Sequence, residues 1–234
     1  MRIGVVTFPG SNCDQDTLDA LDTLGVDTLR LWYRDADLAG ADAVVLPGGF
    51  SYGDYLRSGA LAAKSPIMTA IQEAVVDRQL PLLGICNGFQ ILTEAGLLPG
   101  GLRANHHGQF RCDWQRVKVI EASPLFPGLE AGEVLKLPIA HGEGSYYMDE
   151  ESLQSLFAHG EAWLQYVDAD GQAQSWANPN GSVANLAGVA RGSVAALMPH
   201  PERAMMDILG SDDGHRLLTA WLCGLERRAL YARG

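Results

Sequence analysis

Short apolar runs alternate with longer amphipathic segments in the first part of the chain. Residues 3–6, 29–32, 43–46 and 82–85 lack polar alternation, which predicts strands buried on both faces. Helical patterns lie between them: one begins near Asp14 and is stopped at Gly25, and another begins at Ser65 and Pro66. Because strands joined by helices form βαβ units, we expect an α/β fold with a mostly parallel central sheet and helices on both faces.

The middle of the chain has a different pattern. Strands are predicted at residues 116–120, 134–137, 163–167 and 172–176, and the turn residues 168–171 (DADG) predict a hairpin between the last two. Residues 178–181 (NPNG) indicate another turn, 194–198 a further strand and 213–225 a closing helix. We therefore expect one domain over residues 1–234, with an antiparallel portion flanking the parallel sheet.

Composition excludes several classes of protein. A chain of 234 residues with 47% hydrophobic and 19% charged residues is typical of a globular domain with a large core. Its net charge of -11 argues against extended contact with nucleic acid, which needs Lys and Arg to displace counterions. The N-terminal segment is too short and strand-like for a signal peptide, and no apolar run of about 18 residues occurs, so a cytoplasmic protein is expected.

The thiols and imidazoles show no metal-binding pattern. Four cysteines lie far apart, without CxxC pairs or the density of a disulfide scaffold: Cys13, Cys86, Cys112 and Cys223. The neighbours His106 and His107 would face opposite sides of a strand, so a solvated loop is favoured over a shared metal. We expect no metal site.

Cys86 follows a predicted buried strand and precedes a helical pattern. Ligands of such sheets bind beyond the carboxyl ends of the strands. The motif GICNG at residues 84–88 is the pattern of a nucleophile elbow with sulfur in place of oxygen, and its glycines permit a sharp, strained turn. A thiolate there would be stabilised by the helix N-terminus. The alternative is a small buried apolar side chain, the usual role of a free cysteine.

A base and an orienting carboxylate follow another predicted strand, in the motif MPHPE at residues 198–202. Residues two apart on an extended segment face the same way, so His200 and Glu202 can point together. The alternative is a surface loop whose side chains contact water. Three reactive groups arriving from one sheet edge favour a catalytic set of Cys86, His200 and Glu202.

The motif PGGF at residues 47–50 leaves the third strand. Its glycines predict backbone N–H groups close to a ligand, and the N–H groups of Gly49 and Asn87 would form an oxyanion hole. The alternative is a plain Gly-Gly turn.

These segments together resemble the class I, triad-type glutamine amidotransferases, which share the elbow G-x-C-x-G-x-Q and a distal H-x-E, here at residues 84–90 and 200–202. Longer stretches are similar to the glutaminase subunits of phosphoribosylformylglycinamidine synthase, an enzyme of purine biosynthesis. They are LPGGFSYGDYLR (46–57), GICNGFQ (84–90), HGEG (141–144), NPNGS (178–182) and MPHPERA (198–204). The similarity runs from the first strand to Ala204. It is looser at residues 104–109 and in the connection 190–193, which is shorter than the family leads us to expect, and both departures put only surface contacts in question.

The resemblance implies a mechanism. Cys86 attacks the carboxamide of glutamine, His200 protonates the departing ammonia, and Glu202 orients the imidazole. The resulting γ-glutamyl thioester is hydrolysed to glutamate. The resemblance also implies that Gln90 and the loop of His141, Gly142, Glu143 and Gly144 contact the substrate.

Partners are implied as well. The chain lacks an ATP-binding motif such as GxxxxGK[ST] and is expected to bind no cofactor itself. The resemblance places ATP and Mg²⁺ on a large synthetase subunit, which converts formylglycinamide ribonucleotide to formylglycinamidine ribonucleotide, commonly with a small third subunit. Residues 52–57 follow the oxyanion loop and combine aromatic and Arg side chains, so we expect them near that interface.

Three alternatives remain open. The first is a glutaminase subunit of another amidotransferase, such as pyridoxal-phosphate synthase, against which residues 50–57 argue. The second is a DJ-1/PfpI-like thiol hydrolase, in which histidine would directly follow the cysteine, where Asn87 stands. The third is a binding subunit with a relic triad, which the complete set of three reactive residues disfavours.

Overall fold

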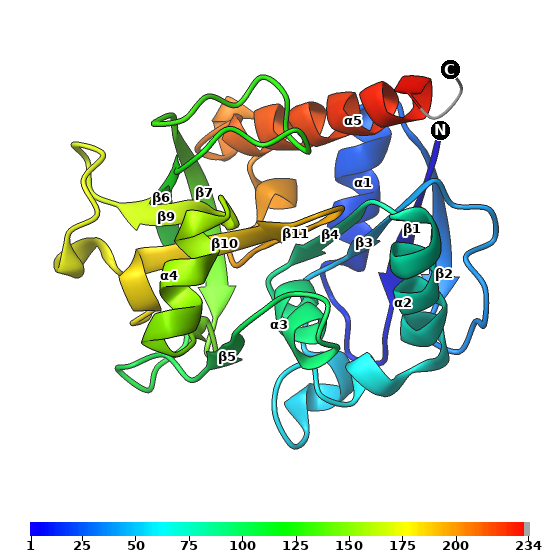
Figure 1. The fold of residues 1–234 in the computed structure, drawn as a ribbon, viewed down its shortest axis with the longest axis horizontal. Helices are drawn as coiled ribbons and strands as arrows, with labels where there is room; N and C mark the ends of the chain where they lie inside the picture. Colours follow the sequence, from blue (N-terminus) through cyan, green and yellow to red (C-terminus); the bar gives the residue numbers. More distant parts are fainter. Residues whose placement is uncertain (232–234) are drawn as a thin grey trace.

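The computed structural model describes residues 1–231 and is built around one nine-stranded sheet, in the order β2-β1-β3-β4-β11-β10-β9-β6-β7 (Figure 1). The first five strands are parallel and the last four pair antiparallel. The strands are β1 (Arg2–Thr7), β2 (Asp27–Trp32), β3 (Ala43–Leu46), β4 (Leu82–Ile85), β6 (Arg111–Val119), β7 (Val134–His141), β9 (Ala162–Val167), β10 (Leu186–Arg191) and β11 (Val194–Leu197). The predicted α/β class and its antiparallel flank are confirmed.

Helices cover both faces of the sheet (Figure 1). One face carries α1 (Asp14–Thr23) and α5 (Asp213–Tyr231), and the other carries α2 (Pro66–Arg78), α3 (Asn87–Glu94) and α4 (Glu150–Ala158). A separate two-stranded ribbon pairs β5 (Gly101–Arg103) with β8 (Ser145–Tyr147). Single 3-10 turns are η1 (Ser51–Asp54), η2 (Ala62–Lys64), η3 (Ser175–Ala177), η4 (Val183–Asn185), η5 (Pro201–Arg203) and η6 (Asp207–Leu209).

Burial along the strands explains why the sequence distinguishes the two parts of the sheet. Every residue of β3, β4 and β11 is buried, because helices cover both faces there. The edge strand β7 instead alternates between buried and partly exposed residues. A continuous apolar run therefore predicts the parallel centre, and alternation predicts the antiparallel edge.

The predicted strand at residues 172–176 is wrong. The turn at 168–171 does form, because the Asp168 carboxylate accepts hydrogen bonds from the backbone N–H groups of Asp170 and Gln172. The chain beyond it enters η3 rather than a strand. Both edges of β9 are already paired, with β10 and with β6, so no edge is free for another strand.

The strand that pairs with β9 is β10, which the sequence did not reveal. Its segment, LAGVAR, contains small residues and a central glycine, a weak strand signal. Gly188 is required because a Cβ there would lie 2.7 Å from the carbonyl oxygen of Ala196. The connection at residues 190–193 is thus the tight hairpin between β10 and β11, in which Arg191 pairs with Val194.

No helix within residues 1–231 is long and apolar enough to cross a membrane.

The packing of α3 on β3 leaves no space for a side chain at Gly88, whose added Cβ would lie 2.0 Å from the Leu46 carbonyl oxygen. We expect Gly88→Ala to lower the free energy of unfolding by about 1–3 kcal/mol, because backbone rather than a flexible side chain must move. Gly101→Ala is the matched control, since a Cβ there meets nothing within 4 Å. Urea denaturation of both variants measures the difference, and equal stabilities would contradict this account.

Candidate active site

Cys86 occupies a strained turn between β4 and α3. Its backbone has φ 50° and ψ -103°, a conformation that costs a non-glycine residue about 1–3 kcal/mol. The flanking glycines permit it: a Cβ at Gly84 would lie 2.6 Å from Leu92 Cδ1, and one at Gly88 would meet the backbone of β3. The predicted elbow geometry is present. Cys86 Sγ is nearly buried, 3.7 Å from the carbonyl oxygen of Ala140.

His200 and Glu202 form a buried pair just beyond β11. Nδ1 of His200 donates a hydrogen bond to Oε1 of Glu202 at 2.6 Å, and both side chains are almost completely buried. The two side chains meet as expected, but the backbone is not the extended segment that the sequence suggested. Pro201–Arg203 forms the 3-10 turn η5, and this turn brings Glu202 back against the imidazole.

The charge state of His200 suits a proton donor. Burial alone would lower the pKa of His200, but the Glu202 carboxylate and the sulfur atoms of Cys86 and Cys13 raise that pKa well above its ordinary value. With Nδ1 occupied by Glu202, the second nitrogen, Nε2, has no hydrogen-bond partner among the described residues. A protonated Nε2 is therefore available to a reacting group.

Two backbone N–H groups are available for an oxyanion. Within residues 1–231, neither the N–H of Gly49 nor that of Asn87 donates to a protein acceptor. Gly49 has φ 146°, and a Cβ there would lie 2.9 Å from the Cα of Ser11, so only glycine fits. Asn87 is the first residue of α3, where N–H groups lack intrahelical acceptors. The oxyanion hole at these two N–H groups stays a prediction, for which both donors are free among the described residues.

A chain of amide hydrogen bonds, here called the amide relay, ties three loops of the site together. The backbone N–H of Ser51 donates to Asn87 Oδ1 at 3.1 Å, and Asn87 Nδ2 donates to Gln90 Oε1 at 2.8 Å. Gln90 Nε2 then donates to the carbonyl oxygen of Glu143 at 2.7 Å. Gln90 was expected to contact substrate; in the structure its Oε1 and Nε2 each have a protein partner, and the side chain joins the elbow to residues 141–144.

Asn105 holds the loop 141–144 from the opposite side. Its Nδ2 donates to the carbonyl oxygen of His141 at 2.9 Å, and its Oδ1 accepts from the N–H of Gly144 at 3.0 Å. A further backbone bond runs from the N–H of Asn105 to the carbonyl oxygen of Gly142. Residues 104–109 therefore support the site directly, whereas the sequence suggested surface contacts alone.

His141 is a neutral support for this loop. The orientation of Asn180 is fixed because its Oδ1 accepts from the Ser182 N–H and its Nδ2 donates to the Gly144 carbonyl oxygen. The same Nδ2 lies 3.0 Å from His141 Nε2, so Nε2 is the acceptor and Nδ1 carries the proton. Burial, reinforced by His200, lowers the pKa of His141 to about 3. The ring is therefore uncharged near neutral pH.

Three residues near the site were not singled out from the sequence. The Tyr166 hydroxyl on β9 is buried and has no hydrogen-bond partner within residues 1–231, and burial, followed by the proximity of Cys86, raises the pKa of Tyr166. Cys13 and Arg203 lie beside His200. Cys13 follows the segment PGSN just after the first strand, at the same sheet edge as the other loops, and that position was the available signal.

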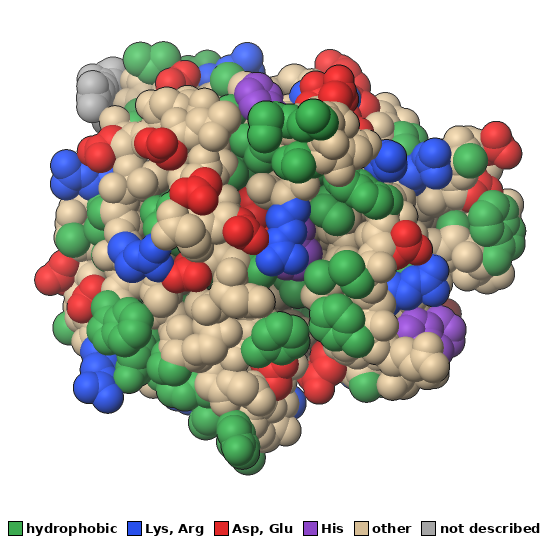
Figure 2. All heavy atoms as spheres, turned by 180° about the vertical axis from the view of Figure 1, so that it is seen from behind, with side chains coloured by type: hydrophobic (Ala, Val, Ile, Leu, Met, Phe, Trp, Pro, Cys, Tyr) green, Lys and Arg blue, Asp and Glu red, His purple; other side chains and the backbone are tan. Residues whose placement is uncertain are grey.

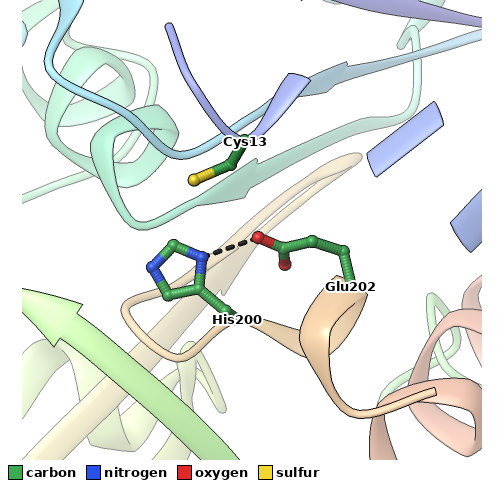
Figure 3. A group of neighbouring side chains, drawn as sticks. All are labelled: Cys13, His200 and Glu202. Carbon is green, nitrogen blue, oxygen red and sulfur yellow. Dashed lines mark hydrogen bonds and ion pairs between the residues drawn. The ribbon is translucent and has the colours of Figure 1, made fainter. Parts of the chain in front are cut away.

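One group of side chains has the spacing of metal ligands. Within residues 1–231, donor atoms of Cys13, His200 and Glu202 all lie within 4.8 Å of one another (Figure 3). Three of the donor atoms already have protein partners, because Arg203 Nη2 donates to Cys13 Sγ at 3.1 Å and His200 Nδ1 donates to Glu202 Oε1 at 2.6 Å. We interpret the group as part of the reactive site rather than as a metal centre.

Comparisons with known proteins agree along nearly the whole chain. A family model described as a CobB/CobQ-like glutamine amidotransferase domain matches residues 1–216. A Thermomicrobium roseum protein named phosphoribosylformylglycinamidine synthase subunit PurQ is 53% identical over 232 residues, which cover 97% of this chain and 98% of that protein. A Methanosarcina barkeri protein of the same name is 49% identical over 221 residues, 93% of this chain and 95% of its own length.

Solved structures show the same fold. A chain in the structure of PurLQS from Thermotoga maritima matches with a TM-score of 0.83 and 40% identity, covering 96% of this chain and 98% of that one. A glutamine amidotransferase from Thermotoga maritima has a TM-score of 0.57 at 16% identity and covers 98% of this chain and 85% of its own, which indicates a shared fold alone.

Asn180 satisfies several buried groups at once, so its removal leaves His141 Nε2 without a donor among the described residues and leaves the Gly144 carbonyl oxygen with only the more distant Ser182 hydroxyl, at 3.3 Å. We expect Asn180→Ala to lower the free energy of unfolding by about 2–4 kcal/mol, because each unpaired buried group costs about 1–3 kcal/mol. Gln174→Ala, at an exposed position, is the control and should stay within about 0.5 kcal/mol of the wild type. Chemical denaturation tests this, and a fully stable Asn180→Ala would show that the loop does not depend on the amide.

Proposed function

This chain belongs to the PurQ subunits of phosphoribosylformylglycinamidine synthase, within the CobB/CobQ-like glutamine amidotransferase family, and from this membership we propose that it is the glutaminase of that enzyme. It hydrolyses glutamine to glutamate and ammonia. The ammonia passes to a synthetase subunit, which converts formylglycinamide ribonucleotide to formylglycinamidine ribonucleotide in purine biosynthesis. The observation that carries the proposal is the strained Cys86 at the same sheet edge as the buried pair of His200 and Glu202, where its sulfur helps to raise the pKa of His200.

Formation of the thioester uses each group in turn. The Cys86 thiolate attacks the carboxamide carbon of glutamine, and the oxyanion that forms accepts hydrogen bonds from the N–H groups of Gly49 and Asn87. When the C–N bond breaks, Nε2 of His200 gives its proton to the departing NH₂ group, which leaves as ammonia. Glu202 stabilises the imidazolium before this step and holds the ring orientation throughout.

Hydrolysis then reverses the proton transfer. Neutral His200 accepts a proton from water at Nε2 as the water oxygen attacks the thioester carbon. The second oxyanion occupies the same pair of N–H groups. Cleavage of the C–S bond restores the Cys86 thiolate beside protonated His200 and releases the γ-carboxylic acid, which gives up its proton to solvent as glutamate, so that atoms and charge balance over the cycle.

Substrate contacts are assigned to the loop at residues 141–144 and to Gln90, by similarity to the family. His141 supports the loop from behind, since its ring is buried and bonded to Asn180. We infer that the backbone of Gly142, Glu143 and Gly144 faces glutamine, and that Gln90 keeps this backbone in register with the elbow.

The proposed partners follow from the separation of glutamine hydrolysis, on this chain, from the ATP-dependent step, on another subunit. The PurLQS structure of Thermotoga maritima contains a chain similar to this one, which supports assembly of this chain with a small third subunit and with a synthetase subunit. ATP and Mg²⁺ belong to the synthetase subunit, and this chain binds no cofactor of its own. The complex acts in the cytoplasm.

An exposed apolar surface suits this assembly. Hydrophobic side chains gather around a hollow on the face shown in Figure 2. Among the exposed large hydrophobic residues, three lie at residues 50–56, after β3, and one directly precedes β6: Phe50, Tyr55, Leu56 and Phe110. The Phe50 and Phe110 rings lie 6.3 Å apart between centroids. Tyr52, Asp54 and Leu56 adopt positive φ, so the backbone of this loop is strained, as it is at ligand clamps and switch regions.

Removal of the nucleophile should separate the two half-reactions. We expect Cys86→Ala, assembled with the synthetase subunit, to lose glutamine-dependent synthesis by roughly three orders of magnitude or more while keeping ammonia-dependent synthesis. Cys223→Ser, on the exposed side of α5, is the control and should keep both activities. Coupled product assays with each nitrogen source measure this. Retained glutaminase activity in Cys86→Ala would refute the assignment of the nucleophile.

A charge in the exposed loop should weaken assembly. We expect Leu56→Asp to weaken binding to the synthetase subunit by about tenfold or more, because an apolar contact at the centre of an interface becomes a buried charge. Asp tolerates the positive φ of this position better than Leu, so folding is preserved. Val76→Asp on α2 is the matched control, since Val76 is 77% exposed and Leu56 is 86% exposed. Titration by calorimetry compares the two, and equal affinities would place the interface elsewhere.

A further inference from the structure

A second thiol lies against the catalytic pair. Cys13 is 3% exposed and precedes α1 as its N-cap residue. Its sulfur points toward the imidazole of His200, on the side away from the backbone of that residue (Figure 3). The mechanism above gives Cys13 no covalent role, so its burial beside the reacting histidine requires another explanation.

The Cys13 thiol and the backbone of Gly48 lie against the Cε1 edge of the His200 imidazole. A Cβ added to Gly48 would lie 2.7 Å from Cε1 of His200 and 3.1 Å from Sγ of Cys13. All three residues therefore meet in one small space, which holds the imidazole between the oxyanion loop and the start of α1. A ring packed in this way has little freedom to rotate about its χ angles.

One guanidinium fixes the thiol. Arg203 Nη2 donates to Cys13 Sγ at 3.1 Å, and Arg203 Nε donates to Asp16 Oδ2 at 3.0 Å. Arg203 directly follows Glu202 in η5, while Cys13 and Asp16 belong to the start of α1. The turn that carries Glu202 is thus tied to α1. Arg203 and His200 also line a pocket of about 360 Å³, so the contact between Arg203 and Cys13 lies next to this pocket.

Several ionisable groups surround His200 besides this thiol. Glu202 and Arg203 approach from η5, Cys86 from the elbow, Cys13 and Asp16 from the start of α1, and His141 from β7. Burial lowers the pKa of His200, whereas Glu202, Cys86 and Cys13 raise it. Arg203 is the cation of this set and interacts electrostatically with Cys13 and Glu202.

We propose that Cys13 is a positioning residue for His200, held in place by Arg203 and Asp16, and that it keeps the imidazole both oriented toward Cys86 and protonated. This inference rests on the proposed glutaminase function. Cys13 forms no bond to substrate. Its sulfur closes one side of the ring and stabilises the imidazolium that protonates the departing ammonia.

The direction of each effect follows from charge. The alkaline limb of the pH profile of kcat/KM reports loss of the proton from His200. Removing the Cys13 sulfur removes a group that raises the pKa of His200, so the limb moves to lower pH. Removing the Arg203 cation leaves the anions around Glu202 unopposed, so the limb moves to higher pH. A purely structural role would lower activity without opposite shifts.

The test measures glutamine hydrolysis against pH for the chain assembled with its synthetase subunit. For Cys13→Ala we expect about a tenfold lower kcat, nearly unchanged KM and an alkaline limb about half a pH unit lower or more. Cys13→Ser, which keeps an acceptor for Arg203, should fall between Cys13→Ala and the wild type. Arg203→Gln should also lose activity, with the limb displaced upward. Cys223→Ser is the control thiol.

The outcomes separate this inference from the function on which it rests. A wild-type complex that hydrolyses no glutamine would defeat the proposed function itself. An active wild type with an unchanged pH profile in both Cys13 variants would overturn the role of Cys13 alone. Thermal unfolding of each variant accompanies the kinetics. If Cys13→Ala does not fold, Cys13→Ser takes its place in the test. The proposal is then overturned if the alkaline limb of the pH profile is unshifted from the wild type in both Cys13→Ser and Arg203→Gln.

Discussion

The buried hydrogen bond between His200 and Glu202 is the interaction on which the site depends. A carboxylate taken out of water is costly unless a partner compensates it, and the imidazolium 2.6 Å away supplies that compensation. One oxygen of Glu202, Oε2, still has no partner among the described residues. The pair therefore needs surroundings that favour both charges: the nearby sulfur atoms favour the imidazolium of His200, and the cation of Arg203 favours the carboxylate of Glu202.

The sheet order explains how such a surrounding can be built from distant parts of the chain. In the order β2-β1-β3-β4-β11, the strands that carry Gly49, Cys86 and His200 are adjacent and parallel, so their carboxyl ends open onto one edge. The loop after β1 arrives at the same edge and brings Cys13. Strain at the elbow is tolerated because close backbone contacts through Gly84 and Gly88 leave the turn no alternative.

Local patterns in the sequence predicted the parts of the molecule that local chemistry determines. Residues 43–46 and 82–85 are apolar throughout because they are buried on both faces, and the observed strands have the same bounds. The pairing of residues 172–176 with β9 was wrong because strand pairing depends on which edges are free, which is a property of the whole sheet. Asn105 was missed for a related reason: its side chain holds residues 36 and 39 positions away, and no short motif encodes such a contact.

Hydrogen bonds connect the exposed loop at residues 51–58 with the buried catalytic site. At one end of the loop, the N–H of Ser51 bonds to Asn87 beside the nucleophile. At the other end, the N–H of Ser58 lies 3.4 Å from the carboxylate of Glu143, whose carbonyl oxygen is bonded to Gln90. The amide relay thus closes a ring of contacts that runs from the loop through the elbow to residues 141–144 and back. Because backbone groups anchor both ends of this ring, a displacement of the loop must displace the oxyanion donors or the substrate loop. We infer that a partner bound to this loop would act on the chemistry without touching Cys86.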